Sequence, residues 1–221
     1  MILESATQVM KTLKEDGFYQ FQSPILTIGE LDNIIQIQEQ VFKPNDDSYQ
    51  FGKAARIGPK ENWTQTPIYN TFNHPTVNEI ALQFFGTQPS FNEIFFTHDY
   101  KNNRGLARNG YLHFDRIPTL KFFVYLSDVD ESNGPFRYIP NSYKLGKRLR
   151  VEANSSTNVY EKIPNRLEID YPELGYTADN TVPVIGPAGT MFVFHSDLFH
   201  MGGEVEGSGF RRIMRIHLRS E

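Results

Sequence analysis

The chain has 221 residues, of which 39% are hydrophobic and 14% aromatic, with no cysteine and a formal net charge of −4. This composition excludes a disordered chain, and the mild charge gives no electrostatic reason to expect binding to nucleic acid or to an anionic membrane. Because cysteine is absent, disulfides, zinc–thiolate sites, iron–sulfur clusters and cysteine nucleophiles are excluded, and any metal must be held by histidine and carboxylate side chains. A long apolar run and a signal peptide are also lacking, so we expect a cytoplasmic protein.

The first 90 residues are predicted to be mainly helical and to support the rest of the chain. Apolar residues recur at helical spacing in three segments, and Gly17 and Gly86 follow the first and the third. Thr27 and Glu30 have the spacing of a capping box at the start of the second. We expect helices over Ala6–Glu15, Thr27–Phe42 and Thr76–Phe85, a short strand over Phe18–Phe21 and a loop over Lys43–Thr66.

From Phe91 onward, short β-branched and aromatic segments alternate with turns, which predicts a sandwich or barrel. We therefore expect a single domain, 1–221, with its β core over 91–221. The predicted strands are Ile94–Tyr100, Tyr111–Asp115, Leu120–Ser127, Phe136–Ile139, Val182–Ile185, Thr190–His195 and Arg211–Leu218. The polar stretch 141–180 shows little periodicity, and we expect a weakly structured insert that acts as a lid or mobile loop.

Two histidines have aspartate two positions on, in His113-Phe114-Asp115 and His195-Ser196-Asp197. In a strand, residues i and i+2 point to the same face, so such a pair can bind one metal ion from one side. A third ligand from a distant strand would complete a facial triad with open positions. His200, 87 residues after His113, is our candidate. The alternative is that each histidine is a hydrogen-bonded core residue, the commoner role of a lone histidine on an aromatic strand.

Arg211 follows His200 by eleven residues and opens the last predicted strand. The planar fork of a guanidinium can hold the far carboxylate of a dicarboxylic acid through two hydrogen bonds. Arg211 and Arg212 are adjacent on a strand, so only one of them can face a cavity. The alternative is a solvated arginine at the start of a surface strand.

Three segments carry a resemblance to a known family. They are KEDGFYQF near the N-terminus, FFVYLSDVDESNGPFRYIPNSY over Phe122–Tyr143, and AGTMFVFHSDLFHMGGEVEGSGFRRIMRIHL near the C-terminus. Together they resemble the phytanoyl-CoA dioxygenase-like family of iron(II)- and 2-oxoglutarate-dependent oxygenases. Asn141 and Tyr143 stand where that family usually has glycine and histidine, and Gly202 stands where it often has serine.

The resemblance implies a double-stranded β-helix, that is, a cupin-like jelly-roll barrel. It further implies that His113, Asp115 and His200 hold iron(II), and that Arg211 pairs with the far carboxylate of 2-oxoglutarate. Turnover with O₂ would give succinate and CO₂ and would hydroxylate a C–H bond of a small molecule. Related halogenases have alanine or glycine at the position of Asp115, so a carboxylate there favours hydroxylation or desaturation. His195 then becomes a candidate cavity residue rather than a ligand.

Further residues are weaker candidates, and ordinary strand or surface packing is the alternative for each. On Ile94–Tyr100, alternation puts Thr97 and Asp99 on one face and Tyr100 on the other. The candidates for 2-oxoglutarate are Tyr100 and Lys101, and those for the substrate are Arg56, Lys121, Arg137 and His195. Arg137 and Arg215 have the strand parity that could aim them inward, and an inward arginine would indicate an anionic substrate.

Two other functions compete with the oxygenase. A jelly-roll binding module without catalysis is disfavoured by the intact triad. A cupin-type metalloenzyme that does not use 2-oxoglutarate is disfavoured by Arg211, because such an enzyme needs no group to hold a cosubstrate.

Overall fold

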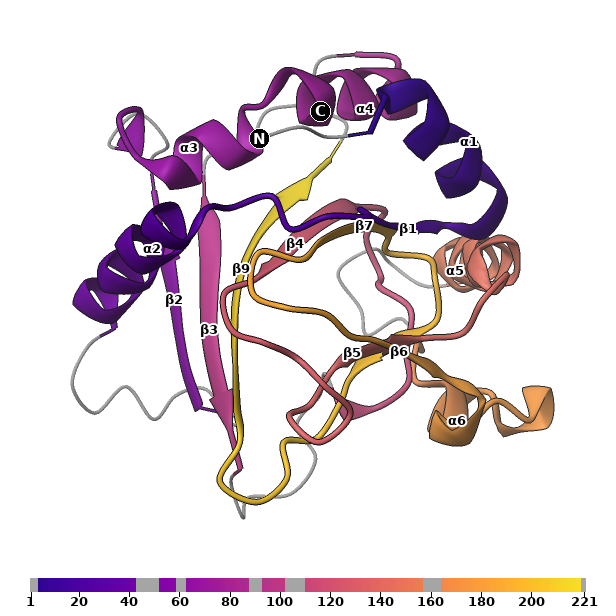
Figure 1. Ribbon diagram of the computed structural model, residues 1–221. Coiled ribbons are helices and arrows are strands. Elements are labelled where there is room, and N and C mark those ends of the chain that lie inside the picture. Colours follow the sequence, from indigo (N-terminus) through magenta and orange to yellow (C-terminus); the bar gives the residue numbers. More distant parts are fainter. Residues whose placement is uncertain are drawn as a thin grey trace.

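The computed structural model describes residues 4–42, 52–58, 63–87, 93–101, 110–156 and 164–219. Two antiparallel sheets form its centre, with strand orders β1-β7-β4-β9-β3-β2 and β6-β5-β8 (Figure 1). The strands are β1 (Phe18–Gln20), β2 (Gly52–Ile57), β3 (Ile94–Tyr100), β4 (Leu120–Tyr125), β5 (Phe136–Tyr138), β6 (Val182–Val184), β7 (Met191–His195), β8 (His200–Gly202) and β9 (Phe210–Leu218). The predicted class, mainly β of the jelly-roll type with N-terminal helices, is confirmed.

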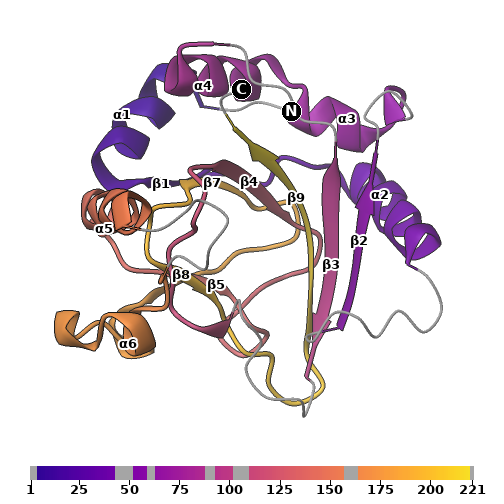
Figure 2. The same ribbon diagram turned by 180° about the vertical axis from the view of Figure 1, so that it is seen from behind.

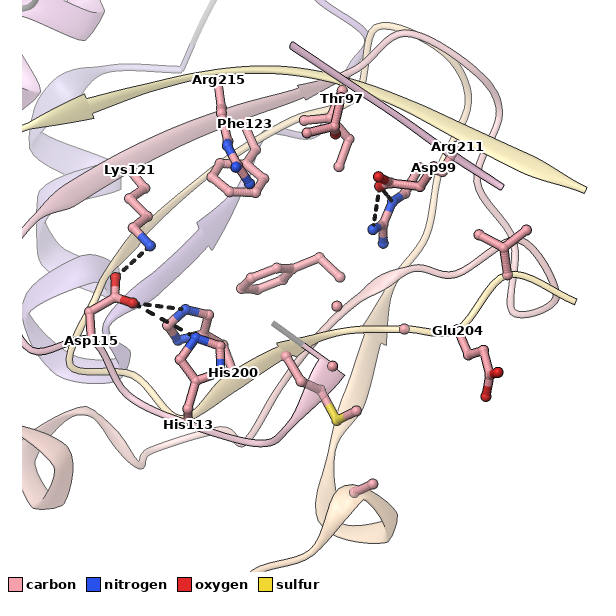
Figure 3. Close-up of a pocket in the computed structure, with 18 of the residues that line it drawn as sticks. Thr97, Asp99, His113, Asp115, Lys121, Phe123, His200, Glu204, Arg211 and Arg215 are labelled. Carbon is pink, nitrogen blue, oxygen red and sulfur yellow. Dashed lines mark hydrogen bonds and ion pairs between the residues drawn. The ribbon is translucent and has the colours of Figure 1, made fainter. Parts of the chain in front are cut away.

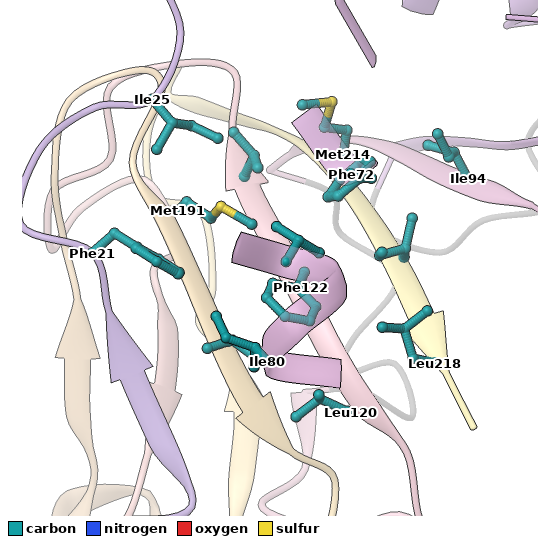
Figure 4. Packing of buried hydrophobic residues seen from close by; sticks show 14 of the residues in the cluster. Phe21, Ile25, Phe72, Ile80, Ile94, Leu120, Phe122, Met191, Met214 and Leu218 are labelled. Carbon is teal, nitrogen blue, oxygen red and sulfur yellow. The ribbon is translucent and has the colours of Figure 1, made fainter. Parts of the chain in front are cut away.

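Four helices from the N-terminal part cover the outer face of the larger sheet (Figures 1 and 2). They are α1 (Ala6–Asp16), α2 (Ile28–Val41), α3 (Pro67–Phe72) and α4 (Pro75–Phe85). Strand alternation supplies the apolar surface on which they pack: Phe122 of β4 and Met214 of β9 are fully buried there, together with Phe72 and Ile80 of the helices (Figure 4). The opposite face of the same strands is left for the cavity.

The caps expected from the sequence form as predicted. Thr27 accepts a hydrogen bond from the backbone of Glu30, whose carboxylate accepts one from the backbone of Thr27. Helices α1 and α4 end at Gly17 and Gly86, each with φ 74°. Glycine suits these positions because a positive φ is costly for residues with a Cβ atom.

The region expected to be one loop, Lys43–Thr66, contains a strand. β2 pairs with β3 along its whole length, from Gly52 opposite Asp99 to Ile57 opposite Ile94. The prediction failed because the segment Gly-Lys-Ala-Ala-Arg-Ile has little β-propensity of its own and is extended by pairing with a distant strand. Residues 43–51 and 59–62 lie outside the described part.

The polar stretch 141–180 was predicted to be weakly structured, and this prediction was wrong for its described residues. It forms α5 (Tyr143–Ser156), α6 (Leu167–Asp170) and two 3-10 turns, Pro172–Leu174 and Ala178–Asn180. The signal was present in Leu145, Leu149 and Ala153, which recur every four residues and pack inward. Residues 157–163, the rest of the expected insert, lie outside the described part. Among the described helices, none is long and apolar enough to cross a bilayer.

Helix α5 packs closely on the segment that leads from β7 to β8. A Cβ atom added at Gly146 would lie 1.9 Å from the backbone oxygen of Asp197. Four residues on, the buried Arg150 binds the Asp197 carboxylate, with Nε 2.5 Å from Oδ1 and Nη2 3.0 Å from Oδ2. The missing side chain of Gly146 thus allows the helix to approach the segment that precedes His200.

Gly146→Ala should therefore destabilise the protein, because α5 must move away from a backbone atom. We expect a loss of about 1–3 kcal/mol in the free energy of unfolding, as for other overpacked sites. Gly29→Ala in α2 is the matched control, since nothing lies within 4 Å of a Cβ atom there. That variant should be neutral or stabilising by up to about 1 kcal/mol. Denaturant unfolding of the two variants measures both values, and equal effects would contradict close packing at Gly146.

Candidate metal centre

The segment carrying His113 and Asp115 is not the regular strand that the sequence predicted. His113 forms isolated bridges to Arg166 and to His200, and its N–H and C=O pair with the C=O and N–H of His200 at 3.0 and 2.8 Å. Asp115 donates its backbone N–H to Ser196 at 2.8 Å. Although this ladder is short, it places the side chains of His113 and Asp115 on the same side of their segment, as expected for residues i and i+2 of a strand.

The structure brings His113, Asp115 and His200 together. One ligand atom of each lies within 4.8 Å of the others, an arrangement able to hold a metal ion. Nε2 of His113 is 3.7 Å and Nε2 of His200 is 3.9 Å from Oδ1 of Asp115. Within the described residues, this is the one cluster of three or more such groups.

Both imidazoles are oriented by backbone carbonyls. Nδ1 of His113 lies 2.7 Å from the oxygen of Tyr111, and Nδ1 of His200 lies 2.6 Å from that of Leu198. Because a carbonyl only accepts hydrogen bonds, Nδ1 carries the proton in each ring. Nε2 is then left with its lone pair facing the centre, which is the tautomer that a metal requires.

The surroundings of the triad favour the protonation states that metal binding requires, namely neutral imidazoles and an ionised carboxylate. Burial lowers the pKa of His200 well below its ordinary value, and the neighbouring His113 acts in the same direction, so the ring is neutral. For Asp115, burial alone would raise the pKa, but the charge of the Lys121 ammonium and its hydrogen bond to the carboxylate act the other way, and the pKa lies well below its usual range. The Lys121 ammonium pairs with Oδ2 of Asp115, so that Oδ1 is the oxygen facing the imidazoles.

A cavity of about 440 Å³ lies between the two sheets beside the triad. Its walls include Thr97 and Asp99 of β3, Lys121 and Phe123 of β4, and Arg211 and Arg215 of β9 (Figure 3). These are alternate residues of three neighbouring strands, so strand periodicity aims all of them to one side. Phe136 and His200 of the smaller sheet face them. Such a volume suits a small organic molecule.

Arg211 and Arg212 face opposite sides of the larger sheet. Arg211 lines the cavity and donates from Nε and Nη2 to Oδ2 of Asp99, at 3.0 and 2.7 Å. Arg212 points to α2, where it binds Gln38 and Glu39 at 2.8 and 2.5 Å. The carboxylate that orients Arg211 was not anticipated from the sequence, although alternation had put Thr97 and Asp99 on one face. Thr97 also lines the cavity, and its hydroxyl is buried without a hydrogen-bond partner in the described structure.

The remaining sequence candidates divide into two groups. Tyr100, Lys101 and Lys121 line the cavity, the first two at its exposed edge. Arg56 does not, because β2 is the edge strand and its side chain is 68% exposed beside Glu93. Arg137 does not either: its Nε donates to the hydroxyl of Thr181 at 2.8 Å and ties β5 to the start of β6.

His195 also lies outside the cavity, which corrects its selection as a substrate residue. Its Nδ1 accepts the backbone N–H of Asp197 at 3.0 Å, and its ring packs on Tyr143 and Phe84 at 4.8 and 5.2 Å. The second H-x-D pair is therefore structural and joins β7 to α5 and α4. Burial lowers the pKa of His195 to about 4, so the ring is neutral in the folded protein.

This depressed pKa predicts acid sensitivity. Below about pH 6.5 the unfolded chain gains a proton at His195 that the folded protein does not accept until about pH 4. The contribution of the neutral His195 to the free energy of unfolding is therefore fully present above about pH 6.5. It falls by about 3 kcal/mol as the pH is lowered from about 6.5 to about 4. In His195→Gln this part of the pH dependence should vanish. Denaturant unfolding at pH 8, 6, 5 and 4 measures the pH dependence of stability in both proteins. If stability fell equally with pH in the wild type and in His195→Gln, the depressed pKa of His195 would be contradicted.

Comparison with known proteins relates the chain to the phytanoyl-CoA dioxygenase family in sequence and to non-haem, α-ketoglutarate-dependent enzymes in fold. The sequence model of the phytanoyl-CoA dioxygenase family matches residues 27–213. No curated protein matches by sequence. Among solved structures, the chain is similar to SnoK, described as a non-haem α-ketoglutarate-dependent carbocyclase from nogalamycin biosynthesis, at 16% identity over 99% of this chain and 87% of that one, with a TM-score of 0.67.

Two further structures contain ligands. The epimerase SnoN, in complex with Fe³⁺, α-ketoglutarate and nogalamycin RO, is 14% identical, with a TM-score of 0.64 over 96% of this chain and 83% of that one. EctD from S. alaskensis, with 2-oxoglutarate and 5-hydroxyectoine, is 14% identical, with a TM-score of 0.61 over 98% and 76%. At these identities the likeness concerns the fold.

Proposed function

The chain belongs to the phytanoyl-CoA dioxygenase family, and on that premise we propose that it is an iron(II)- and 2-oxoglutarate-dependent dioxygenase that hydroxylates a C–H bond of a small molecule. The observation that carries the proposal is the convergence of His113, Asp115 and His200 beside a cavity. Iron(II) held there would supply the reaction of O₂ with 2-oxoglutarate, giving succinate and CO₂ and oxidising the substrate.

Iron(II) held by these three side chains would keep coordination positions free for other ligands, as in a facial triad. Lys121 engages one carboxylate oxygen of Asp115, which favours binding of the metal through the other oxygen alone. The Nδ1–carbonyl contacts hold both imidazole planes before the metal arrives. Those free positions would serve the keto-acid end of 2-oxoglutarate and O₂.

Arg211 is our proposed partner for the far carboxylate of 2-oxoglutarate. Asp99 holds the Nε and Nη2 side of its guanidinium and so fixes the orientation of the remaining edge. Gly202 lacks the hydroxyl that the family often has near this carboxylate, and we propose that the hydroxyl of Thr97, two residues from Asp99 on the wall of the cavity, substitutes for it. Tyr100 and Lys101 lie at the cavity edge, where they could contact the keto acid only as it enters.

Asp115 favours hydroxylation over halogenation, because its carboxylate fills the coordination position that a halide would need. The fold itself serves other outcomes, since similar structures are described as a carbocyclase and an epimerase. A binding module without catalysis would have no need for two tautomer-locked histidines around one carboxylate. The substrate is a small molecule, as the cavity volume indicates.

Anaerobic titration with iron(II) and then 2-oxoglutarate tests the proposal. The wild type should develop the visible charge-transfer band of the ternary complex and release succinate when O₂ is admitted. In Asp115→Ala, loss of a ligand leaves Lys121 unpaired beside the metal, and iron affinity should fall by more than about 100-fold. His195→Gln is the matched control and should keep the band. Unchanged iron affinity in Asp115→Ala, or a chlorinated product formed in chloride buffer, would refute the assignment.

The arginine pair provides a second test. Arg211→Met should weaken 2-oxoglutarate binding by about 30-fold or more, the expected loss when one partner of a desolvated charge pair is removed. The loss is reinforced because Asp99 is then buried without its cation. Arg212→Met, which alters only the opposite face, should leave the 2-oxoglutarate affinity within about threefold of wild type. Titration of the same visible band measures both, and a larger effect at Arg212 would contradict the assignment of the two faces.

A further inference from the structure

His217 of β9 lines the cavity, and its polar atoms are not used by the protein. Within the described residues, neither nitrogen of its ring takes part in a hydrogen bond, and Nε2 is buried. The ring is stacked on Phe95 of β3, with the centroids 4.5 Å apart and the planes at 21°. Because buried polar groups in proteins are nearly always paired, an unpaired ring on a cavity wall indicates that its partner is a bound molecule.

The other histidines of this region show the usual arrangement. Nδ1 of His113 and Nδ1 of His200 are fixed by backbone carbonyls at 2.7 and 2.6 Å, and Nδ1 of His195 accepts a backbone N–H at 3.0 Å. Of the three histidines that line the cavity in the described structure, two are metal-ligand candidates, and His217 is the one without a hydrogen bond.

The position of His217 along β9 assigns it to the metal end of the cavity. It is directly opposite Lys121 of β4, which pairs with Asp115. Arg211 lies six residues away, or about 20 Å of strand, and is held there by Asp99 (Figure 3). A five-carbon diacid whose far carboxylate pairs with Arg211 therefore lies toward the Asp99 end. The wall that includes His217 is left to the substrate.

The chemistry of the ring limits what it binds. Burial, together with the charges of Lys121 and Arg215, lowers the pKa of His217 to about 2, so the imidazole is neutral and offers one N–H and one lone pair. The same two cations disfavour a substrate ammonium group beside the ring. A carboxylate gains less from a neutral ring than from a cation. A hydroxyl group both donates and accepts, so it pairs with either nitrogen of either tautomer.

We propose that His217 binds a hydroxyl group of the substrate, so that the enzyme acts on a small molecule that already carries an alcohol. The inference rests on the proposed function, and it adds the class of molecule that the oxygenase accepts. Stacking on Phe95 fixes the plane of the ring and thereby the direction of its hydrogen bond. His217 thus determines specificity by orienting the substrate, with a carbon near the alcohol turned toward the metal centre.

The first test uses the wild-type holoenzyme with saturating 2-oxoglutarate. Small alcohols, polyols and hydroxy acids are each compared with the deoxy analogue, in which hydrogen replaces the hydroxyl. At least one hydroxy compound should stimulate succinate release by about tenfold or more, and its deoxy analogue should have a KM at least about tenfold higher, because the imidazole is then left unpaired. If no hydroxy compound stimulates release, or if the deoxy analogues serve equally well, the inference is overturned.

The second test changes the ring. His217→Phe keeps an aromatic side chain against Phe95 but removes both nitrogens. The KM for the hydroxy compound should rise by about tenfold or more while that for the deoxy analogue stays within about threefold, so the preference for the alcohol disappears. A merely structural role would change both values alike and would contradict the proposal. His217→Asn or His217→Gln, which keep a donor and an acceptor near Nδ1 or Nε2, should restore part of the preference.

His98 provides the matched control. Its Nδ1 is also buried without a hydrogen-bond partner in the described structure, but it lies on the other face of the larger sheet, opposite Arg212, and outside the cavity. Its ring packs on Tyr100 and Phe210 at 5.9 and 5.4 Å, so phenylalanine suits the site. His98→Phe should keep the wild-type preference for the alcohol. A loss as large as that in His217→Phe would overturn the assignment to the cavity face.

Two further outcomes identify which conclusion fails. If His217→Phe weakens 2-oxoglutarate binding in the anaerobic band by more than about threefold while the preference for the alcohol persists, His217 serves the cosubstrate. The inference is then overturned and the proposed function stands. If the wild type forms no band and releases no succinate with any compound, the proposed function fails, and the inference fails with it.

Discussion

The backbone bridge between His113 and His200 is the interaction on which the candidate site depends. Each residue donates its N–H to the carbonyl of the other, and this brings together two segments that are 87 residues apart. The imidazole centroids are consequently 4.4 Å apart. Each ring is then locked by the carbonyl two residues before it, and Asp115 follows two residues after His113, so one pair of hydrogen bonds positions all three groups.

Strand β9 carries cavity-lining arginines on one face and buried apolar side chains on the other. Arg211 and Arg215 point to the cavity, while Met214 and Ile216 pack into the core beneath the N-terminal helices. A shift of one residue in register would exchange the two sets, and the cost of burying two arginines in an apolar core prevents it. The cavity charges are thus kept in place by the hydrophobic core on the other side of the sheet, and the helices contribute to the site through this strand.

The two H-x-D pairs show how one local pattern serves two purposes. At His113 the imidazole is fixed through Nδ1 by a carbonyl, and its other nitrogen faces the centre. At His195 the same nitrogen accepts a backbone N–H, and the ring is enclosed by aromatic side chains. Asp197 is saturated by Arg150 of α5, whereas Asp115 keeps one oxygen toward the histidines. Partners from elsewhere in the chain decide between a ligand and a structural group.

The sequence by itself determined the helix caps and most strands, and it predicted the three residues that converge in the structure and the arginine of β9 that faces the cavity, because each follows from spacing along one segment or from a family motif. Only the tertiary structure decided the rest. The strand β2 exists through pairing with β3, and helix α5 is held by Gly146 and Arg150 against a distant turn. Asp99 became the partner of Arg211, and Arg137 was directed away from the cavity, through neighbours on other strands. Strand alternation determines that two consecutive side chains point to opposite faces of the sheet. Which of the two reaches the cavity depends on the segments that cover each face.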